Sequence, residues 1–166
     1  VNGGNFSGGN YYGNNNLSDY GYGGTFVVTG GTYSAKPAAK YIADGYNVIE
    51  TEVDGVKYYS VVPEGAVVEN PIVSASQLQA LGGKQLSGTY NLLADIDMAG
   101  YDMTPMILKN SLVFNGNGHT ISNLTINGQA MFTIFANGAD VEFKDVTFEN
   151  ATVSANGINV GIIVGQ

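Results

Sequence analysis

Two stretches near the carboxyl end, HTISNLTING (residues 119–128) and VEFKDVTFEN (residues 141–150), show the same apolar–polar alternation 22 positions apart. Alternation with a period of two is typical of β-strands, and so short a repeat leaves too little chain for a long helix in each copy. Successive copies are therefore predicted to stack as short parallel strands, with apolar side chains lying on their equivalents one turn away. The alignment predicts three such pairs: Ile121 with Phe143, Leu124 with Val146, and Ile126 with Phe148.

The same offset extends the pattern in both directions. Downstream, VGIIVG (160–165) begins a further turn. Strands that stack in this way predict an all-β fold, a parallel β-helix, and the preference of parallel crossovers for one hand makes it right-handed. A leucine-rich repeat is the nearest alternative, but NGQAMFTIFANGAD (127–140) resembles a further short strand between glycine turns. Upstream, the offset predicts two more pairs: Tyr90 with Leu112, and Leu92 with Phe114.

A second repeat lies at the amino end, where VNGGNFSG (1–8) recurs as VTGGTYSA (28–35) at an offset of 27. Eight aligned positions are too many for a chance match between glycine-rich segments. Residues 1–35, rich in Gly, Asn and Tyr, are therefore predicted to form β-helix-like turns.

Residues 36–83 show no such repeat and are predicted to form a small insertion of helix, hairpin and helix. KPAAKYIADG (36–45) has a proline suited to the first helical position and a glycine at its end. Two strands then flank Asp54-Gly55, a pair that tolerates positive φ at both turn positions. The second helix opens with Ser74 and Gln77 in capping-box spacing. It is predicted to cover the open end of the β-helix that spans residues 84–166, which we interpret as truncated at its carboxyl end.

The composition excludes several classes of function. Fourteen acidic residues face six lysines, for a net charge of -8, which repels the phosphate backbone of nucleic acids. The apolar runs are far shorter than the roughly 20 residues that span a bilayer, so direct membrane insertion is not expected. The chain has no cysteine, so disulfides do not hold the fold together.

The only histidine, His119, directly follows Gly118, and Gly116 lies three positions before it. Catalysis would need a positioned nucleophile and an orienting group, and a metal site would need further His or Cys ligands; the sequence offers neither pattern. We therefore predict that His119 is a structural residue of a tight turn and that the chain has no catalytic residues. Asn123 is expected to lie on Asp145 in a side-chain ladder. The residues predicted to be structural are Gly116, Gly118, His119, Asn123, Leu124, Ile126, Asp145, Val146 and Phe148.

Three carboxylates, Asp95, Asp97 and Asp102, lie close together in the sequence. Such a group can bind calcium or serve as the acid pair of a glycosidase. The favoured interpretation is a polar outer face of an amphipathic strand, since apolar residues alternate with Asp95 and Asp97. Calcium is the only cofactor considered, as a speculative metal site of these three residues.

Tyrosines set among Asn and Gly form a second candidate site. Rigid, amphipathic rings of this kind can stack on sugars or on a protein partner, and packing onto the flank of the β-helix is the alternative. The speculative ligand-binding residues are Tyr11, Tyr12, Tyr20 and Tyr22.

The region from about residue 76 to residue 166 resembles bacterial cell-surface β-helix proteins that carry the GLUG motif. The resemblance rests on Y-x-L-x-A-D-I-D (90–97), G-N-G-H-T-I (116–121), N-L-T-I (123–126) and V-G-x-x-V-G (160–165). The chain departs from the motif at Ile162 and Ile163, where glycine and leucine are usual. Residues 28–62 also resemble a segment that recurs in surface and phage proteins of gut bacteria.

The resemblance implies an adhesive role outside the cell or on its surface. We expect a non-enzymatic β-helix that presents its flank to a glycan or protein of a host or neighbouring cell, or that self-associates through its ends. Two alternatives remain open: a bacteriophage virion fibre or decoration protein, and a fragment of a carbohydrate-active enzyme that uses the three aspartates.

Overall fold

The computed structural model describes residues 5–6, 27–134, 140–155 and 160–165. It is an all-β structure that divides into two compact units, Val1–Pro71 and Ile72–Gln166. Helix in the described residues is limited to a 3-10 turn, η1 (Ala39–Tyr41), and the short helix α1 (Ala75–Gln79). No helix in this part of the chain is long and apolar enough to cross a membrane.

The first unit is a four-stranded mixed sheet in the order β1-β2-β4-β3. Its first two strands pair in parallel, with Asn5 beside Thr32, which is the offset of 27 that the amino-terminal repeat predicts. The remaining pairs are antiparallel, so the described strands of this unit do not form a stack of parallel turns. The strands are β1 (Asn5–Phe6), β2 (Thr32–Tyr33), β3 (Tyr46–Val53) and β4 (Val56–Pro63).

The hairpin of β3 and β4 turns at Asp54-Gly55, as predicted. Both residues have positive φ, 52° and 79°, which is the requirement of a type I′ turn. The helix predicted within residues 36–45 is only the single 3-10 turn η1, so the predicted length is wrong. No side chain caps its start, and the backbone around Tyr41 pairs with Val28 instead of continuing a helix.

The second unit consists of three parallel sheets that the chain visits repeatedly in the same order. We call each passage a level of the stack. Level 1 contains β6 (Gln85–Leu92), β7 (Ile96–Asp97) and β8 (Asp102–Met103). Level 2 contains β9 (Met106–Asn115), β10 (Thr120–Ser122) and β11 (Thr125–Asn127). Level 3 contains β12 (Phe132–Ile134), β13 (Val141–Lys144), β14 (Thr147–Glu149) and β15 (Thr152–Ser154).

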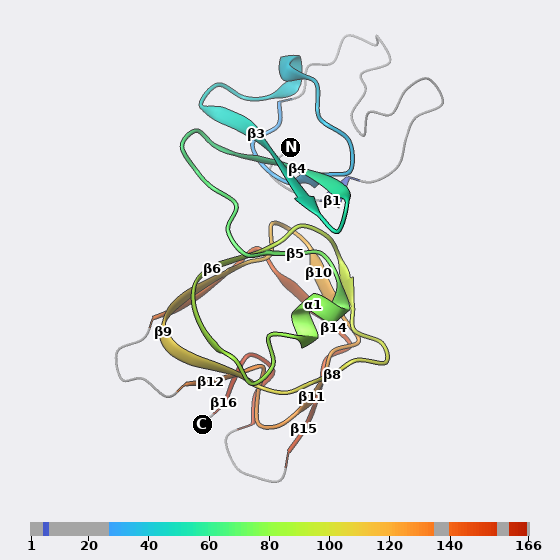
Figure 1. Cartoon of the computed structure of the whole chain (residues 1–166), viewed down its shortest axis with the longest axis vertical. Helices are drawn as coiled ribbons and strands as arrows, with labels where there is room; N and C mark the ends of the chain where they lie inside the picture. Colours follow the sequence, from blue (N-terminus) through green and yellow to red (C-terminus); the bar gives the residue numbers. More distant parts are fainter. Residues whose placement is uncertain (1–4, 7–26, 135–139, 156–159, 166) are drawn as a thin grey trace. The chain divides into compact units, whose positions relative to one another are not determined.

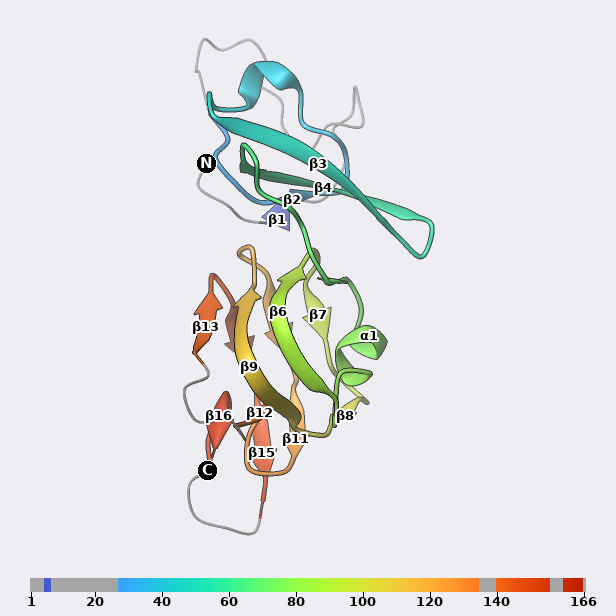
Figure 2. The same ribbon diagram turned by 60° about the vertical axis from the view of Figure 1, so that its left-hand side comes forward.

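Corresponding strands of successive levels lie side by side. The sheet orders are β14-β10-β7, β15-β11-β8 and β16-β12-β9-β6-β5, with β13 also paired to β9. Strand β5 (Pro71–Ile72) begins the largest sheet, and β16 (Val164–Gly165) pairs in parallel with β12, so the VGIIVG segment does begin a further level. Figure 1 shows the three sheets arranged around a common interior, and Figure 2 shows β6 and β9 along the stack.

The predicted register of 22 residues is wrong for the segments on which it was based. Ile121 lies beside Phe148, and Ile126 beside Val153, so levels 2 and 3 are 27 residues apart in both sheets. Phe143 lies beside Phe114 instead. Further upstream, Tyr90 lies beside Phe114 and Gly88 beside Leu112, because a bulge after Leu86 shifts the register.

This shift also separates Leu124 from Val146. The amide of Thr152 donates to the carbonyl of Leu124, and the amide of Thr147 donates to the carbonyl of His119. Leu124 therefore corresponds to Ala151 in level 3, and Val146 corresponds to His119. An alternating strand pattern fits several offsets, and only the lengths of the intervening turns decide among them.

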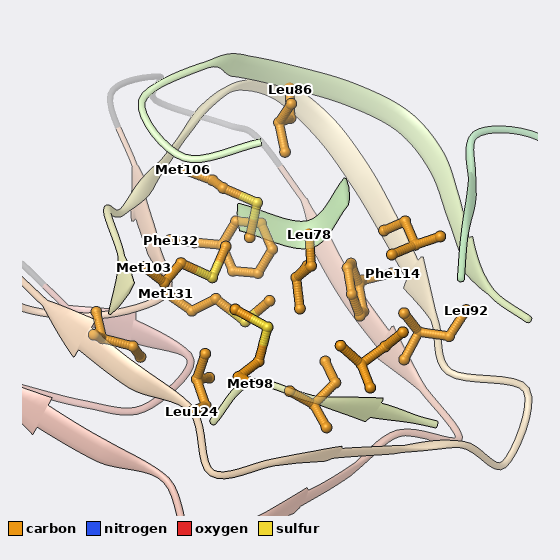
Figure 3. Packing of buried hydrophobic residues seen from close by; sticks show 14 of the residues in the cluster. Leu78, Leu86, Leu92, Met98, Met103, Met106, Phe114, Leu124, Met131 and Phe132 are labelled. Atoms are coloured by element: carbon orange, nitrogen blue, oxygen red, sulfur yellow. The ribbon is translucent and has the colours of Figure 1, made fainter. Parts of the chain in front are cut away.

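The interior of the stack is formed by buried apolar side chains. Figure 3 shows side chains from α1 and from strands of different levels converging on it. Phe114 and Phe132 meet edge to face with ring centroids 6.1 Å apart, and Phe143 lies 5.3 Å from Phe132. Residues of the interior that are fully buried include Leu78, Leu92, Met98, Met103, Met106, Leu108, Leu112, Leu124, Ile126 and Met131.

Helix α1 covers the level-1 end of this interior. It starts at Ser74, whose hydroxyl accepts from the amide of Gln77 in the predicted cap. Leu78 is completely buried in the core, with Leu81 packed against it. The unit boundary at Pro71 places this helix in the second unit, whereas the sequence had grouped residues 36–83 together.

Candidate functional site

A column of polar side chains runs along the turn between two sheets, the sheet of β7, β10 and β14 and the sheet of β8, β11 and β15. The amide Nδ2 of Asn123 donates to Oδ1 of Asp97 over 2.9 Å, and Nδ2 of Asn150 donates to Oδ1 of Asn123 over 3.4 Å. Each level contributes one member, so we call Asp97, Asn123 and Asn150 the aspartate–asparagine ladder. A ladder was predicted here, but with Asp145 as the partner of Asn123, and that partner is wrong.

Backbone geometry explains why asparagine recurs in the ladder. Asn123 and Asn150 have φ of 54° and 53°, in the left-handed region that asparagine tolerates better than most residues. The turn therefore selects a residue whose amide both donates and accepts, and this amide links one level to the next. The ladder is exposed along its length.

Asp97 is the acidic end of the ladder. Its Oδ1 also accepts from the amide of Ala99 over 2.9 Å. The hydrogen bond from Asn123, followed by that from Ala99, lowers the pKa of the Asp97 carboxyl below its ordinary value. The carboxylate is thus ionised at neutral pH and engaged as an acceptor, which suits a turn-stabilising residue better than a general acid.

His119 and Asp95 form a second contact between levels 1 and 2. Nδ1 of His119 lies 3.2 Å from Oδ1 of Asp95, and the same oxygen accepts from the amide of Thr120 over 3.0 Å. The imidazole is completely buried, and its Nε2 has no hydrogen-bond partner among the described residues. Burial lowers the pKa of His119 and outweighs the opposing effect of Asp95, so the ring is held neutral.

The turn before His119 lets two levels approach closely. Asn117 and Gly118 have positive φ, 51° and 82°. Gly116 is required for space, because a Cβ at this position would lie 2.4 Å from the carbonyl oxygen of Asp145 in the next level. The flanking glycines thus have different roles, one conformational and one steric.

The three aspartates proposed as a metal or acid site do not converge. Asp95 and Asp97 bond different partners at β7, and Asp102 lies on β8 in another sheet, beside Thr125. Within residues 27–134, 140–155 and 160–165, no group of three or more His, Cys, Asp or Glu side chains could hold a metal ion.

The sequence analysis missed two features of the flank. One is a part-buried pair, in which Nδ2 of Asn115 donates to Oδ1 of the buried Asn91 over 3.2 Å. The other is a set of threonine rows, with Thr120 beside Thr147 and Thr125 beside Thr152. The signal for these rows was present in TISNLTIN (120–127) and TFENATVS (147–154), which share Thr, Asn and Thr at matching positions.

The proposed tyrosine site, Tyr11, Tyr12, Tyr20 and Tyr22, lies outside the described residues. Tyr33, from the same compositional region, belongs to the core of the first unit. Its hydroxyl donates to the carbonyl of Gly30 over 2.8 Å, and burial raises the pKa of the phenol to about 12.

Comparison with protein-family models, with curated proteins and with solved structures finds no match for this chain. The functional argument therefore depends on the geometry of the described residues. That geometry combines an apolar interior with regular rows of hydroxyl, amide and carboxylate groups on the outside of the stack.

Proposed function

We propose that the second unit is a right-handed parallel β-helix that serves as a non-enzymatic structural and adhesion module, extracellular or on a cell surface. Its flank, formed by the outward side chains of β10, β11, β14 and β15, would bind a glycan or a protein on a host or neighbouring cell. The resemblance to GLUG-type surface proteins supports this proposal, and so does a net charge that disfavours nucleic acid.

The observation that carries the proposal is the repetition of side chains between levels 2 and 3. Thr120, Asn123 and Thr125 each lie in register with an identical residue of the next level. Neighbouring parallel strands are about 4.8 Å apart, so the flank presents hydroxyl and amide groups at a regular spacing. Such groups both donate and accept hydrogen bonds, as sugar hydroxyls require.

A glycan array probed with the whole chain tests this function. We expect binding to a polar glycan that the double variant Thr125→Val, Thr152→Val weakens about tenfold or more, since each lost hydrogen bond contributes about 0.5–1.5 kcal/mol. Thr51→Val, in the β3–β4 hairpin of the first unit, is the matched control and should bind as the parent chain does.

Two other outcomes would replace the proposal. Turnover of a polysaccharide that Asp97→Asn abolishes while the circular dichroism spectrum is retained would make the chain part of a carbohydrate-active enzyme. Stable trimers in sedimentation, with no glycan bound, would favour a virion fibre. Melting of the chain with and without calcium tests separately whether Asp95, Asp97 or Asp102 contributes to a metal site.

A further inference from the structure

Several asparagines of level 2 are followed directly by glycine. In such an Asn–Gly step, the backbone nitrogen of the glycine can attack the side-chain carbon Cγ of the asparagine, because the glycine has no Cβ to hinder the approach. The new N–C bond closes a succinimide ring, and the side-chain nitrogen leaves as ammonia. Water then opens the ring to give aspartate or isoaspartate. The described steps of this kind are Asn115-Gly116, Asn117-Gly118 and Asn127-Gly128.

The fold engages the attacking nitrogen of each step in a hydrogen bond to level 3. The glycine amides donate to carbonyl oxygens of the next level: Gly116 to Lys144 over 2.7 Å, Gly118 to Asp145 over 2.8 Å, and Gly128 to Ser154 over 3.1 Å. A buried or paired amide must lose its acceptor before it can react. Reaction at any of the three steps therefore requires a local opening between levels 2 and 3.

The side chains of the first two steps are held as well. Nδ2 of Asn115 donates to Oδ1 of Asn91, and Oδ1 of Asn115 accepts from the amide of Asn117 over 3.2 Å. Nδ2 of Asn117 donates to the carbonyl of Leu92 over 2.9 Å. Asn91 and Leu92 belong to β6, so these two carboxamides must also break their contacts with level 1 before they can turn toward the following nitrogen.

Asn127 lacks this second restraint. It is the last residue of β11 and lies beside Ser154, the last residue of β15, and Figure 2 shows these two strands together. Its side chain is exposed, and no described residue holds it by a hydrogen bond. The bond between Gly128 and Ser154 is at the end of both strands, where local opening costs least.

We propose that Asn127 is a site of spontaneous modification, at which the folded protein converts asparagine to aspartate or isoaspartate, while Asn115 and Asn117 are protected. Water is the only co-reactant, and ammonia is the leaving group. Both products add a carboxylate to the outside of the stack. The proposal concerns the chemistry of this residue alone, so it does not depend on glycan binding by the flank.

The isoaspartate product should also change the structure around it. Its main chain runs through the side-chain carbons, which lengthens the backbone before Gly128. This glycine is closely packed, because an added Cβ would lie 2.5 Å from Cγ of Pro105. The longer backbone therefore displaces the amide of Gly128 from the carbonyl of Ser154 and loosens the end of the pair that β11 forms with β15.

Ageing of the whole chain in heavy-oxygen water at neutral pH tests the proposal. Each reacted asparagine gains a heavy oxygen in its new carboxyl group, and tandem mass spectrometry of proteolytic peptides locates it. In the folded protein we expect Asn127 to react about tenfold faster than Asn115 or Asn117, because the latter two must break additional hydrogen bonds. In urea the three should react at similar rates, since each precedes a glycine.

Asn127→Ser is the matched control, because serine already occupies the register partner Ser154. Other Asn–Gly steps of the chain lie outside the described residues and age equally in the parent and the variant. The aged parent should therefore lose more of its melting temperature than the aged variant does. Labelling by an isoaspartyl methyltransferase should mark residue 127 in the parent only.

Equal rates at the three asparagines of the folded protein would overturn the proposal, and so would a faster reaction at Asn115 or Asn117. The proposal also fails if Asn127 stays intact in the folded protein while it reacts in urea. Equal losses of melting temperature in the aged parent and the aged variant would contradict the structural change at Gly128.

Discussion

The two units of this chain specify their strand pairing in different ways. In the first unit, β3 and β4 are joined by the two-residue turn Asp54-Gly55, and the turn alone fixes their register from Val53–Val56 to Tyr46–Pro63. In the second unit, paired strands such as β10 and β14 are 27 residues apart. A local turn motif can be recognised in sequence, whereas a distant register depends on every turn and bulge between the strands.

The largest expected effect is a difference in the free energy of unfolding between equivalent phenylalanines of levels 2 and 3 in the second unit. Phe114→Ala should lower the free energy of unfolding by about 3–5 kcal/mol, since its ring is buried against Phe132. Phe143→Ala, its partner in level 3, should cost only about 1–2 kcal/mol because part of this ring is already in water. Urea denaturation followed by circular dichroism measures both, and equal losses would show that level 3 is covered in solution.

Two glycines, one in each unit, are required for different reasons: Gly116 because there is no space for a side chain, and Gly55 because its φ is positive. Gly116→Ala should cost about 1–3 kcal/mol, because the new Cβ would press levels 2 and 3 apart. Gly55→Ala has open space around it but keeps a positive φ, so it should cost about 1–2 kcal/mol.

Asparagine replacements distinguish the two causes. Gly55→Asn should recover much of the lost stability, since asparagine tolerates positive φ. Gly116→Asn should recover none, because its Cβ meets the same backbone atoms. Recovery at both glycines would mean that space is not limiting at Gly116.

Acid should destabilise the second unit before the first. Burial lowers the pKa of His119 in the folded state, so the unfolded chain takes up a proton first as the pH falls below about 6.5. Stability is then lost between pH 6.5 and the lower folded pKa, at no more than about 1.4 kcal/mol per pH unit. Thermal melts across this range measure the loss.

His119→Val is the control for this effect, since valine occupies the corresponding position, Val146, in level 3. This variant should remove the loss in that pH range. The first unit has no histidine and should keep its stability there. A loss of equal size in the variant would show that another group titrates.

The smallest effect is expected at an exposed ion pair of the hairpin. Nζ of Lys57 lies 2.6 Å from Oε1 of Glu50, and the hydrogen bond to Lys57 lowers the pKa of Glu50. Both groups are exposed, so solvent screens the pair. Lys57→Met should leave the melting temperature of the first unit nearly unchanged, and a large drop would indicate that the pair fixes the hairpin.

The local elements of the fold could be predicted because each has a chemical signature of its own. Asp54-Gly55 gave the hairpin, and Ser74 with Gln77 gave the start of α1. The parallel stacking of short strands was also expected from their alternation. The offset of 22 was wrong because alternation alone cannot distinguish Phe143 from Phe148 as the partner of Ile121.

The sequence predicts that polar side chains of the flank bond one another, but it does not predict which residues are partners. Asn123 was expected in a ladder, yet its partners are Asp97 and Asn150, which follow from the true register. The contact between His119 and Asp95 depends on two turns 24 residues apart, and no local motif encodes it. The threonine rows could have been predicted from the identical Thr and Asn residues of the two segments. An alignment based on apolar residues alone does not detect such identities.

The register of levels 2 and 3 is the central claim, and engineered disulfides test it directly because the chain has no cysteine. Thr125→Cys combined with Thr152→Cys joins residues in register, at the short Cα separation of adjacent strands that a disulfide needs. Thr125→Cys combined with Thr147→Cys represents the offset of 22. We predict that mild oxidation closes the first pair and leaves the second reduced, as measured by thiol counting in the folded protein. Closure of the second pair without the first would contradict this account.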